Sequence, residues 1–353
     1  MAYTTIDKPT DYFNTVTWTG TSDATTSVTG VNFQPDFVWI KNRNVADDHT
    51  LHDVVRGSTK TLFSNATNSE GTNAESIKSF DTDGFTTGNH RGTGGDSGNG
   101  MVAWNWLAGG TASSNTDGDI TSTVSVNQTS GFSIVKSNTG GQPSSTTVSI
   151  GHGLNAVPKF FIVKNLPSAD NWYVYHNSLG NTKGIILSST NGEFTNADIW
   201  GSTTPTSSVF SINTGEWGVS TQDKITYCFA EKKGFSKFGS YTGNGNADGT
   251  FVYTGFKPAW LMIKRTDSAD AWFMFDNKRA GAYSPNTNPS WEFLLANASN
   301  TGANTDRIDL YSNGFKMRYA WDSINASGGS YIYMAFAENP FVTSTGIPTV
   351  ARW

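Results

Sequence analysis

One pattern of apolar positions occurs three times along the chain. It consists of a proline, one variable residue, four large apolar residues and a lysine, at residues 35–41, 158–164 and 258–264. The three copies align without gaps, which identifies an internal repeat. Four consecutive apolar residues place side chains on both faces of a strand, so we predict a core strand covered on both sides, within a sandwich or beneath a neighbouring unit. We expect the lysine to return the chain to solvent.

Polar residues follow each of these strands at a fixed spacing. An aspartate lies twelve residues after each proline, at Asp47, Asp170 and Asp270. Its side chain suits a turn before a strand, where it accepts a backbone N–H. Two residues further on, the later copies have Trp172 and Trp272, whereas the first has His49. The spacing therefore predicts a second strand after each turn.

Further strands complete each repeat. Aromatic or aliphatic residues alternate with small polar ones at 12–20, 131–140 and 234–243, as in half-buried strands. Large and small residues alternate in a closing strand, which favours packing against another sheet. We predict an all-β protein of three tandem β-sandwich units related by the internal repeat. The units are residues 1–110, 120–231 and 232–341, with a flexible Gly/Ser-rich linker at 111–119 and a C-terminal tail at 342–353.

Composition supports this fold and narrows the function. Aromatic residues make up 13% of the 353 residues and there are 37 glycines, as strands joined by turns require. Charged residues are 15% and the net charge is -5, which argues against a nucleic-acid partner. Cys228 is the only cysteine, so we expect a small core residue and no disulfide within the chain. Neither a signal peptide nor a membrane-inserted segment is expected.

The candidates for catalysis and metal binding are weak. His49 and His52 lie among aspartates, but the later repeats have no comparable cluster, so a polar strand start is the better interpretation. The segment 81–84 begins like a calcium loop, yet Gly92 replaces the required glutamate, so we predict a turn. Glu231 and Glu338 occupy equivalent repeat positions, which favours a structural role over a catalytic pair. We predict no catalytic residue, no metal and no cofactor.

Aromatic residues outside the repeated strands are the candidates for binding. Aromatic faces stack on sugar C–H groups, and segments that differ between repeats are suited to contacts with partners. The candidate ligand or partner contacts are Trp200, Trp217, Tyr283, Trp291, Tyr319 and Trp321.

Several segments resemble a known family. The opening residues 1–7, the segment 30–43, the segment 229–245 and the segment 331–341 are typical of a repeated β-rich domain of virion-associated proteins of tailed bacteriophages, common in marine phages. The resemblance covers nearly the whole chain. It implies concanavalin-like, jelly-roll sandwiches on a phage particle, and it transfers no catalytic residues.

The resemblance and the composition lead to one expected function. We expect a structural, non-enzymatic virion protein, made in the host bacterial cytoplasm and displayed on the particle surface. The first hypothesis is a tail fibre or tail-tip protein, a homotrimer or other homo-oligomer that contacts other virion proteins and a host surface glycan or protein. The alternative is a capsid decoration or head-fibre protein, which the absence of a coiled-coil stalk keeps open. A glycan-degrading tailspike is disfavoured because no paired carboxylates are recognisable.

Overall fold

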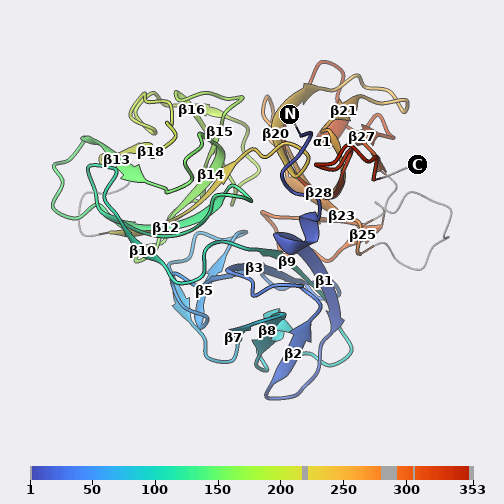
Figure 1. The fold of residues 1–353 in the computed structure, drawn as a ribbon, viewed down its shortest axis with the longest axis horizontal. Coiled ribbons are helices and arrows are strands. Elements are labelled where there is room, and N and C mark those ends of the chain that lie inside the picture. The colour runs from blue at the N-terminus through green and yellow to red at the C-terminus, as the bar shows by residue number, and fades with distance from the viewer. Residues whose placement is uncertain (1, 217–221, 280–291, 305–306, 350–353) are drawn as a thin grey trace.

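A computed structural model describes residues 2–216, 222–279, 292–304 and 307–349. Within these ranges the chain is almost entirely strands and connecting turns (Figure 1). Its helical elements there are two 3-10 turns, η1 (Pro9–Asp11) and η2 (Arg91–Thr93), and one helical turn, α1 (Asp322–Asn325). No helix in these ranges is long and apolar enough to cross a membrane. The prediction of an all-β sandwich protein is confirmed.

The first sandwich, residues 13–106, has two sheets. The larger has six strands in the order β1-β9-β3-β4-β5-β6. These are β1 (Phe13–Thr19), β9 (Gly100–Trp106), β3 (Phe37–Asn42), β4 (Thr50–Asp53), β5 (Lys60–Phe63) and β6 (Gly71–Thr72). The smaller sheet has the order β2-β8-β7 and consists of β2 (Thr26–Thr29), β8 (Gly84–Thr87) and β7 (Ile77–Asp81).

The second sandwich, residues 113–230, has an eight-stranded sheet in the order β10-β11-β12-β19-β14-β15-β16-β17. Its strands are β10 (Ser113–Asn115), β11 (Ser122–Asn127), β12 (Phe132–Asn138), β19 (Asp223–Ala230), β14 (Pro158–Asn165), β15 (Tyr173–His176), β16 (Lys183–Ile186) and β17 (Phe194–Thr195). Strands β13 (Thr147–Gly151) and β18 (Val209–Asn213) form the smaller sheet. Strand β10 lies inside the predicted flexible linker 111–119. This part of the linker is therefore an ordered edge strand, paired with β11.

The third sandwich, residues 236–340, has a six-stranded sheet in the order β20-β28-β22-β23-β24-β25. Its strands are β20 (Ser236–Thr242), β28 (Ser330–Pro340), β22 (Phe256–Arg265), β23 (Trp272–Asp276), β24 (Glu292–Leu295) and β25 (Ala303–Asn304). The smaller sheet, in the order β21-β27-β26, has β21 (Phe251–Tyr253), β27 (Gly314–Met317) and β26 (Ile308–Tyr311). In all three larger sheets the closing strand lies between the opening strand and the proline strand, and the later strands follow in chain order.

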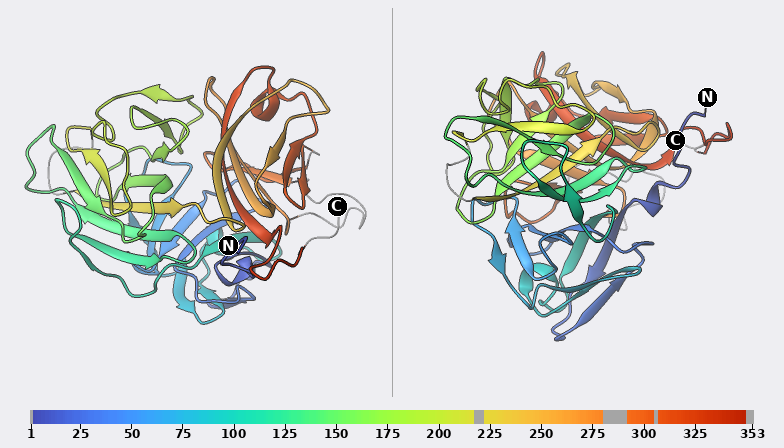
Figure 2. Two further views of the ribbon diagram at one scale, coloured as in Figure 1. Left: turned by 45° about the horizontal axis from the view of Figure 1, so that its top comes forward. Right: turned by 60° about the vertical axis from the view of Figure 1, so that its left-hand side comes forward.

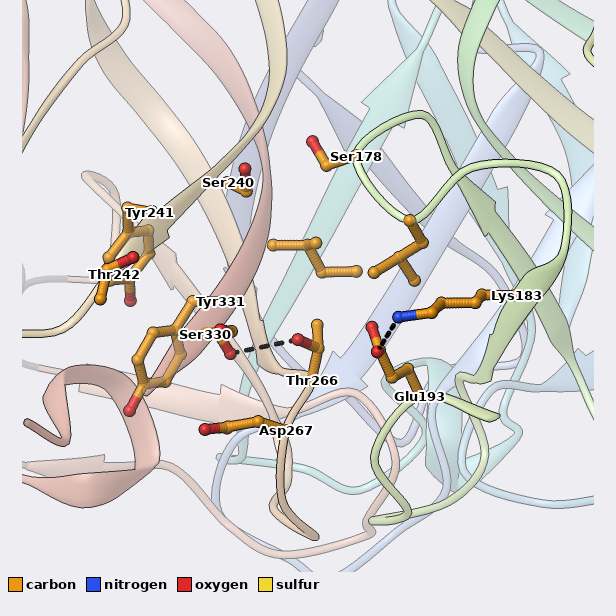
Figure 3. A pocket seen from close by; sticks show the side chains of 12 residues that line it. Ser178, Lys183, Glu193, Ser240, Tyr241, Thr242, Thr266, Asp267, Ser330 and Tyr331 are labelled. Atoms are coloured by element: carbon orange, nitrogen blue, oxygen red, sulfur yellow. Dashed lines mark hydrogen bonds and ion pairs between the residues drawn. The ribbon is translucent and has the colours of Figure 1, made fainter. Parts of the chain in front are cut away.

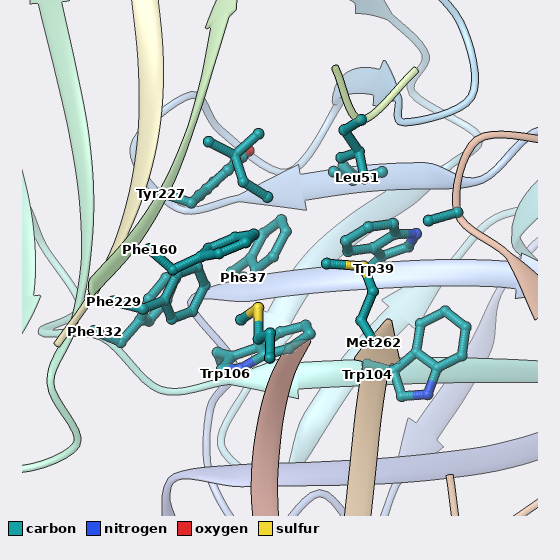
Figure 4. Close-up of a cluster of buried hydrophobic side chains, with 14 of the residues drawn as sticks. Phe37, Trp39, Leu51, Trp104, Trp106, Phe132, Phe160, Tyr227, Phe229 and Met262 are labelled. Carbon is teal, nitrogen blue, oxygen red and sulfur yellow. The ribbon is translucent and has the colours of Figure 1, made fainter. Parts of the chain in front are cut away.

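The three proline strands, β3, β14 and β22, are apolar on both faces. In β3, Val38 and Ile40 pack with the smaller sheet of their own sandwich. Phe37 and Trp39 point the other way, into a cluster to which all three sandwiches contribute (Figure 4). Strands β14 and β22 divide their side chains in the same way, with Phe160, Ile162, Trp260 and Met262 in the shared cluster. The predicted double covering is confirmed, by a sandwich layer on one face and by neighbouring sandwiches on the other.

This shared cluster, which we call the central core, joins every pair of sandwiches. Phe37 stacks on Tyr227 with 4.2 Å between ring centroids, which joins the first sandwich to the second. Phe13 stacks on Phe336 at 4.9 Å, which joins the first to the third. Phe160 stacks on Phe238 at 6.0 Å, which joins the second to the third. The sandwiches therefore lie around one centre (Figure 2).

Backbone hydrogen bonds close the three sandwiches into a ring. The residue just before the edge strand β6, β17 or β25 donates to the turn after the next proline strand. These bonds run from Glu70 N to Leu166 O at 2.7 Å, from Glu193 N to Thr266 O at 2.8 Å, and from Gly302 N to Arg43 O at 3.1 Å. The third bond returns to the first sandwich. The chain ends add a further link, since Ser344 N donates to Asp7 Oδ1 at 2.6 Å. We call the three regions where neighbouring sandwiches meet, marked by the bonds from Glu70, Glu193 and Gly302, the joints.

The lysine near the end of each proline strand is buried. Lys164 Nζ donates to the carbonyls of Thr67, in the first sandwich, and Asp170, at 2.8 and 2.7 Å. Lys264 Nζ donates in the same way to Thr190 and Asp270 at 2.9 and 2.6 Å. Lys41 is also fully buried, and burial lowers the pKa of each of these lysines to about 8. The expected return to solvent is wrong, because the preceding sandwich supplies acceptors to Lys164 and Lys264, and Lys41 donates to the carbonyls of Asn42 and Val45.

The tryptophans two residues after Asp170 and Asp270 form hydrogen bonds across the joints. Asp170 and Asp270 accept the N–H of the next residue at 2.7 and 2.8 Å, which confirms the predicted turn. The indole of Trp172 donates to Phe63 O at 2.8 Å, and that of Trp272 to Ile186 O at 2.9 Å. Each bond crosses to the preceding sandwich.

His49 takes the place of these tryptophans at the joint between the first and third sandwiches. Its Nδ1 accepts the indole N–H of Trp39 at 2.9 Å, and the ring faces the backbone carbonyls of Leu295 and Ala298. Because burial holds the pKa of His49 well below its usual range, the ring stays neutral there. The first repeat thus has a histidine at the joint where the other two repeats have a tryptophan.

A second set of buried polar contacts crosses the joints near the central core. Tyr227 Oη donates to Asp53 Oδ2 at 2.8 Å, and Trp104 Nε1 donates to Asp276 Oδ2 at 2.9 Å. Each aspartate is also held by a buried arginine three residues later, with the Nε to Oδ2 distance 2.5 Å in both pairs. In the second sandwich His176 stands at this position, and its Nε2 lies 3.3 Å from Tyr333 O. Burial lowers the pKa of His176 to about 4.

Truncation of central-core side chains should destabilise the whole protein. We expect Trp39→Ala and Trp260→Ala to cost about 3–5 kcal/mol each, and Ile162→Ala about 2–5 kcal/mol, because each leaves a cavity where sandwiches meet. Denaturant unfolding followed by tryptophan fluorescence and circular dichroism measures these costs. The control is Thr29→Ala on the exposed face of β2, expected to change stability by less than about 0.5 kcal/mol. Near-neutral values at all three core positions would contradict the assignment.

Stability should fall in mild acid because of buried histidine. An unfolded histidine has a pKa of about 6.5, above the folded value of about 4 for His176. Between these pH values only the unfolded chain binds the proton, so the free energy of unfolding decreases as pH falls from about 6.5 to about 4. We expect His176 to contribute roughly 3 kcal/mol to that decrease. Denaturation curves at several pH values should show a shallower slope for His176→Gln; an unchanged slope would contradict the burial argument.

Candidate functional site

The joint between the second and third sandwiches contains an open cleft of about 400 Å³ (Figure 3). Sites for small molecules in proteins commonly have volumes of about 300–1,000 Å³. Both sandwiches supply the lining, which consists of Ser178, Leu179, Lys183, Glu193, Ser240, Tyr241, Thr242, Thr266, Asp267, Ser330, Tyr331 and Ile332. The cleft is the leading candidate site among the residues that the structure describes.

The strand register places the cleft side chains. Strands β20 and β28 pair so that Ser240 lies opposite Ile332 and Thr242 opposite Ser330. Residues two apart on a strand point to the same face, so Ser240 and Thr242 both reach the cleft. Ser178 comes from the turn between β15 and β16, on the facing sandwich. The cleft is therefore formed only when the joint is assembled.

The charged side chains of the cleft are already paired. Lys183, at the start of β16, forms an ion pair with Glu193 (Figure 3). Asp267 accepts Arg265 Nε at 2.8 Å from the same turn. Each carboxylate retains lone pairs, since an ionised carboxylate has about four acceptor sites. The cleft thus offers hydrogen-bond acceptors without a net charge.

Two tyrosines lie behind the wall of the cleft that β20 and β28 form, with their rings in the core of the third sandwich. Tyr241 and Tyr331 stack with 4.8 Å between ring centroids and an interplanar angle of 11°. The Tyr331 hydroxyl accepts Ala326 N at 2.7 Å and donates to Asp322 O at 2.5 Å, while Tyr241 Oη donates to Ile324 O at 2.7 Å. Burial raises the pKa of both phenols. These hydroxyls lie behind the wall and are not offered to a ligand.

Four other hydroxyls of the cleft are available. The side chains of Ser178, Ser240, Thr242 and Ser330 are exposed, and their oxygens make no hydrogen bond to another residue within the described ranges. Each hydroxyl has one donor and two acceptor lone pairs. Together with the spare lone pairs of Glu193 and Asp267, they make the cleft a surface for a ligand that both donates and accepts.

At one other joint the equivalent positions are charged. Between the first and second sandwiches a cleft of about 300 Å³ is lined by Glu70, Lys136, Asn138, Leu166, Pro167 and Asp223. There Lys136 and Asp223 stand in the register positions of Ser240 and Ser330 and form an ion pair at 2.9 Å. Between the third and first sandwiches, Arg43 binds both carboxylate oxygens of Glu292 at 2.8 Å. At that joint Thr17 stands in the register position of Ser240, and its side chain is exposed.

The aromatic residues chosen from the sequence lie elsewhere. Trp200 is fully buried in the core of the second sandwich, where its indole donates to Lys183 O at 2.8 Å, so its ring has no surface for a ligand. Tyr319 is 50% exposed and Trp321 is half-buried, with the Arg307 guanidinium 5.0 and 4.4 Å from their ring centroids. The candidates Trp217, Tyr283 and Trp291 lie outside the described residues. Sequence reasoning missed the cleft because serines and threonines carry no distinctive pattern.

The weak metal candidates have structural roles. His52 is buried, with Nδ1 3.0 Å from Ser58 O and Nε2 3.0 Å from Ser76 Oγ, and burial lowers its pKa to about 3. The residues that resembled a calcium loop form the turn between β7 and β8, where Asp81 pairs with Gly84, which confirms the predicted turn. Over the described ranges, no group of three or more His, Cys, Asp or Glu side chains is placed to hold a metal ion.

These features define an all-β protein in which three sandwiches share one core, with a hydroxyl-lined cleft at the joint between the second and third. The chain belongs to a family described as a domain of unknown function (DUF7483), whose model matches residues 8–340. No curated protein and no solved structure matches the chain. The family match therefore spans all three sandwiches without assigning an activity.

Stability measurements should distinguish the free serine hydroxyls from the tyrosine hydroxyls that hold the fold together. We expect Ser240→Ala and Ser330→Ala to change the free energy of unfolding by less than about 0.5 kcal/mol, because no internal hydrogen bond is lost. Tyr331→Phe should cost about 1–3 kcal/mol, since it leaves Ala326 N and Asp322 O without their partner. Thermal or denaturant unfolding of the three variants measures the difference. A large loss for either serine variant would show that its hydroxyl supports the fold.

Proposed function

We propose that this protein is a non-enzymatic structural component of a bacteriophage virion, displayed on the particle surface as a tail fibre or tail-tip protein. The observation that carries the proposal is the closed ring of three sandwiches around one buried aromatic core. A protein exposed on a free particle must stay folded without cellular support. The only cysteine, Cys228, is buried and free, so this stability comes from packing and from the joints.

The resemblance of the repeated segments to phage virion proteins supports the same placement. The open polar cleft supports a host-binding role, because it offers unused hydrogen-bonding groups at a surface that the fold does not need. As a tail component the chain would assemble as a homotrimer or other homo-oligomer with other virion proteins. Its receptor would be a glycan or protein of the host surface.

A capsid decoration or head-fibre protein is the alternative. Three sandwiches joined by equivalent contacts give one chain a three-part shape around a common centre. Such a shape suits a three-fold position on an icosahedral shell, where a single copy meets three similar surroundings. This alternative places the protein on the head.

A glycan-degrading tailspike is the less favoured function. Hydrolysis of a glycosidic bond requires one carboxyl group as acid and another as base or nucleophile across the bond. In the cleft, Glu193 is paired with Lys183 and Asp267 with Arg265, so both carboxylates already bind a cation of the protein. We therefore propose binding without cleavage. Release of reducing ends from host polysaccharide by the purified protein would contradict that choice.

The location of the protein in the particle tests the proposal. Antibodies raised against the purified protein should label the tails of intact phage particles in immunogold electron microscopy, with particles that lack the gene as the control. Label on the head would replace the tail proposal by the alternative. Purified particles that bind no antibody, and whose dissociated proteins also lack the chain by mass spectrometry, would contradict a virion role.

A further inference from the structure

We infer that the cleft between the second and third sandwiches binds an uncharged saccharide. This inference rests on the proposed function, because it names the chemical class of host receptor that the cleft would recognise. Three observations carry it: the balanced charge, the free hydroxyls, and the different chemistry of the joint between the first and second sandwiches.

The charge of the cleft selects against ionic ligands. Its lysine is paired with Glu193, and its aspartate with Arg265. A phosphate or carboxylate ligand would need a cation freed from its partner, and a cationic ligand would need a freed carboxylate. Both exchanges cost the existing ion pairs, so an uncharged ligand fits the cleft best.

The hydrogen-bonding groups match a ligand that is rich in hydroxyls. Serine and threonine hydroxyls both donate and accept, whereas the spare lone pairs of Glu193 and Asp267 only accept. A ligand complementary to this set needs many donors that are also acceptors, closely spaced on a small frame. Saccharides present such groups around each ring. Hydrogen bonds to the two carboxylates would be charge-assisted and therefore the stronger ones.

The apolar part of the lining matches the remaining face of a sugar. Leu179 is half-buried, and Ile332 is a buried residue of the facing sandwich, opposite Ser240 on the neighbouring strand. Sugar rings carry C–H groups on the faces that their hydroxyls leave free, and these groups gain from leaving water. A cleft with an apolar floor and a polar rim therefore accommodates a saccharide better than a fully polar or fully apolar molecule.

The joint between the first and second sandwiches has an ion pair at the positions where the cleft has free hydroxyls. The ion pair of Lys136 with Asp223 occupies the positions of Ser240 and Ser330 at one joint. Arg43 with Glu292 spans the other. At the joint between the first and second sandwiches, an ion pair thus fills the two positions that Ser240 and Ser330 leave as free hydroxyls. Transfer of that ion pair gives a direct test.

The test compares saccharide binding by the full chain and by Ser240→Lys/Ser330→Asp. The probes are neutral gluco-, manno- and galacto-configured trisaccharides, measured by saturation-transfer NMR and titration calorimetry. We expect at least one of them to bind the unaltered protein and the double variant to lose at least tenfold in affinity. The matched control is Thr17→Lys, at the register position in β1 that corresponds to Ser240, expected to bind within twofold of the unaltered protein.

Three results would overturn the inference: equal affinity in the double variant, tighter binding of sialylated or phosphorylated trisaccharides than of neutral ones, or no binding of any neutral trisaccharide. If the double variant does not fold, as judged by circular dichroism, Ser240→Ala/Thr242→Ala replaces it, with an expected loss of at least threefold. Failure here is distinguishable from failure of the virion proposal, because the particle-labelling experiment does not depend on sugar binding.

Discussion

The packing of three sheet faces against one another is the constraint on which the structure depends. Each larger sheet has one apolar face for its own sandwich and a second for the central core. Exposed apolar surface costs about 25 cal/mol per Å², so a sandwich taken alone would leave a costly face in water. The three sandwiches are consequently parts of one folding unit, although each has a small core of its own.

Hydrophobic packing alone does not fix how the sandwiches are oriented toward one another. The polar groups at the joints fix that orientation. Lys164 and Lys264 reach carbonyls of the preceding sandwich, and Trp172 and Trp272 do the same with their indoles. A buried donor left without an acceptor is expensive, so these bonds penalise any other docking of the sandwiches. At the third joint the neutral ring of His49 takes the place of an indole and faces the carbonyls of Leu295 and Ala298.

The sequence allowed the fold to be predicted further than the site. The run of four apolar residues correctly indicated strands covered on both faces, because that inference needs only the alternation of side chains along a strand. The lysine was misjudged because no local pattern shows that carbonyls such as Thr67 O lie above it. The cleft was missed for the same reason: Ser178 and Ser240 are far apart in the chain, and only sheet register and sandwich docking bring them together.

The closed ring also has a consequence for synthesis on the ribosome. The first sandwich emerges early, yet Arg43 and Ser64 find Glu292 and Ala296 only when the third is nearly complete. Until then, Phe37 and Trp39 face a vacant centre, and the nascent chain carries an apolar surface that its finished form hides. Truncation within the third sandwich would therefore yield an aggregating fragment and not a smaller working protein. The ring is complete only when all three sandwiches are present.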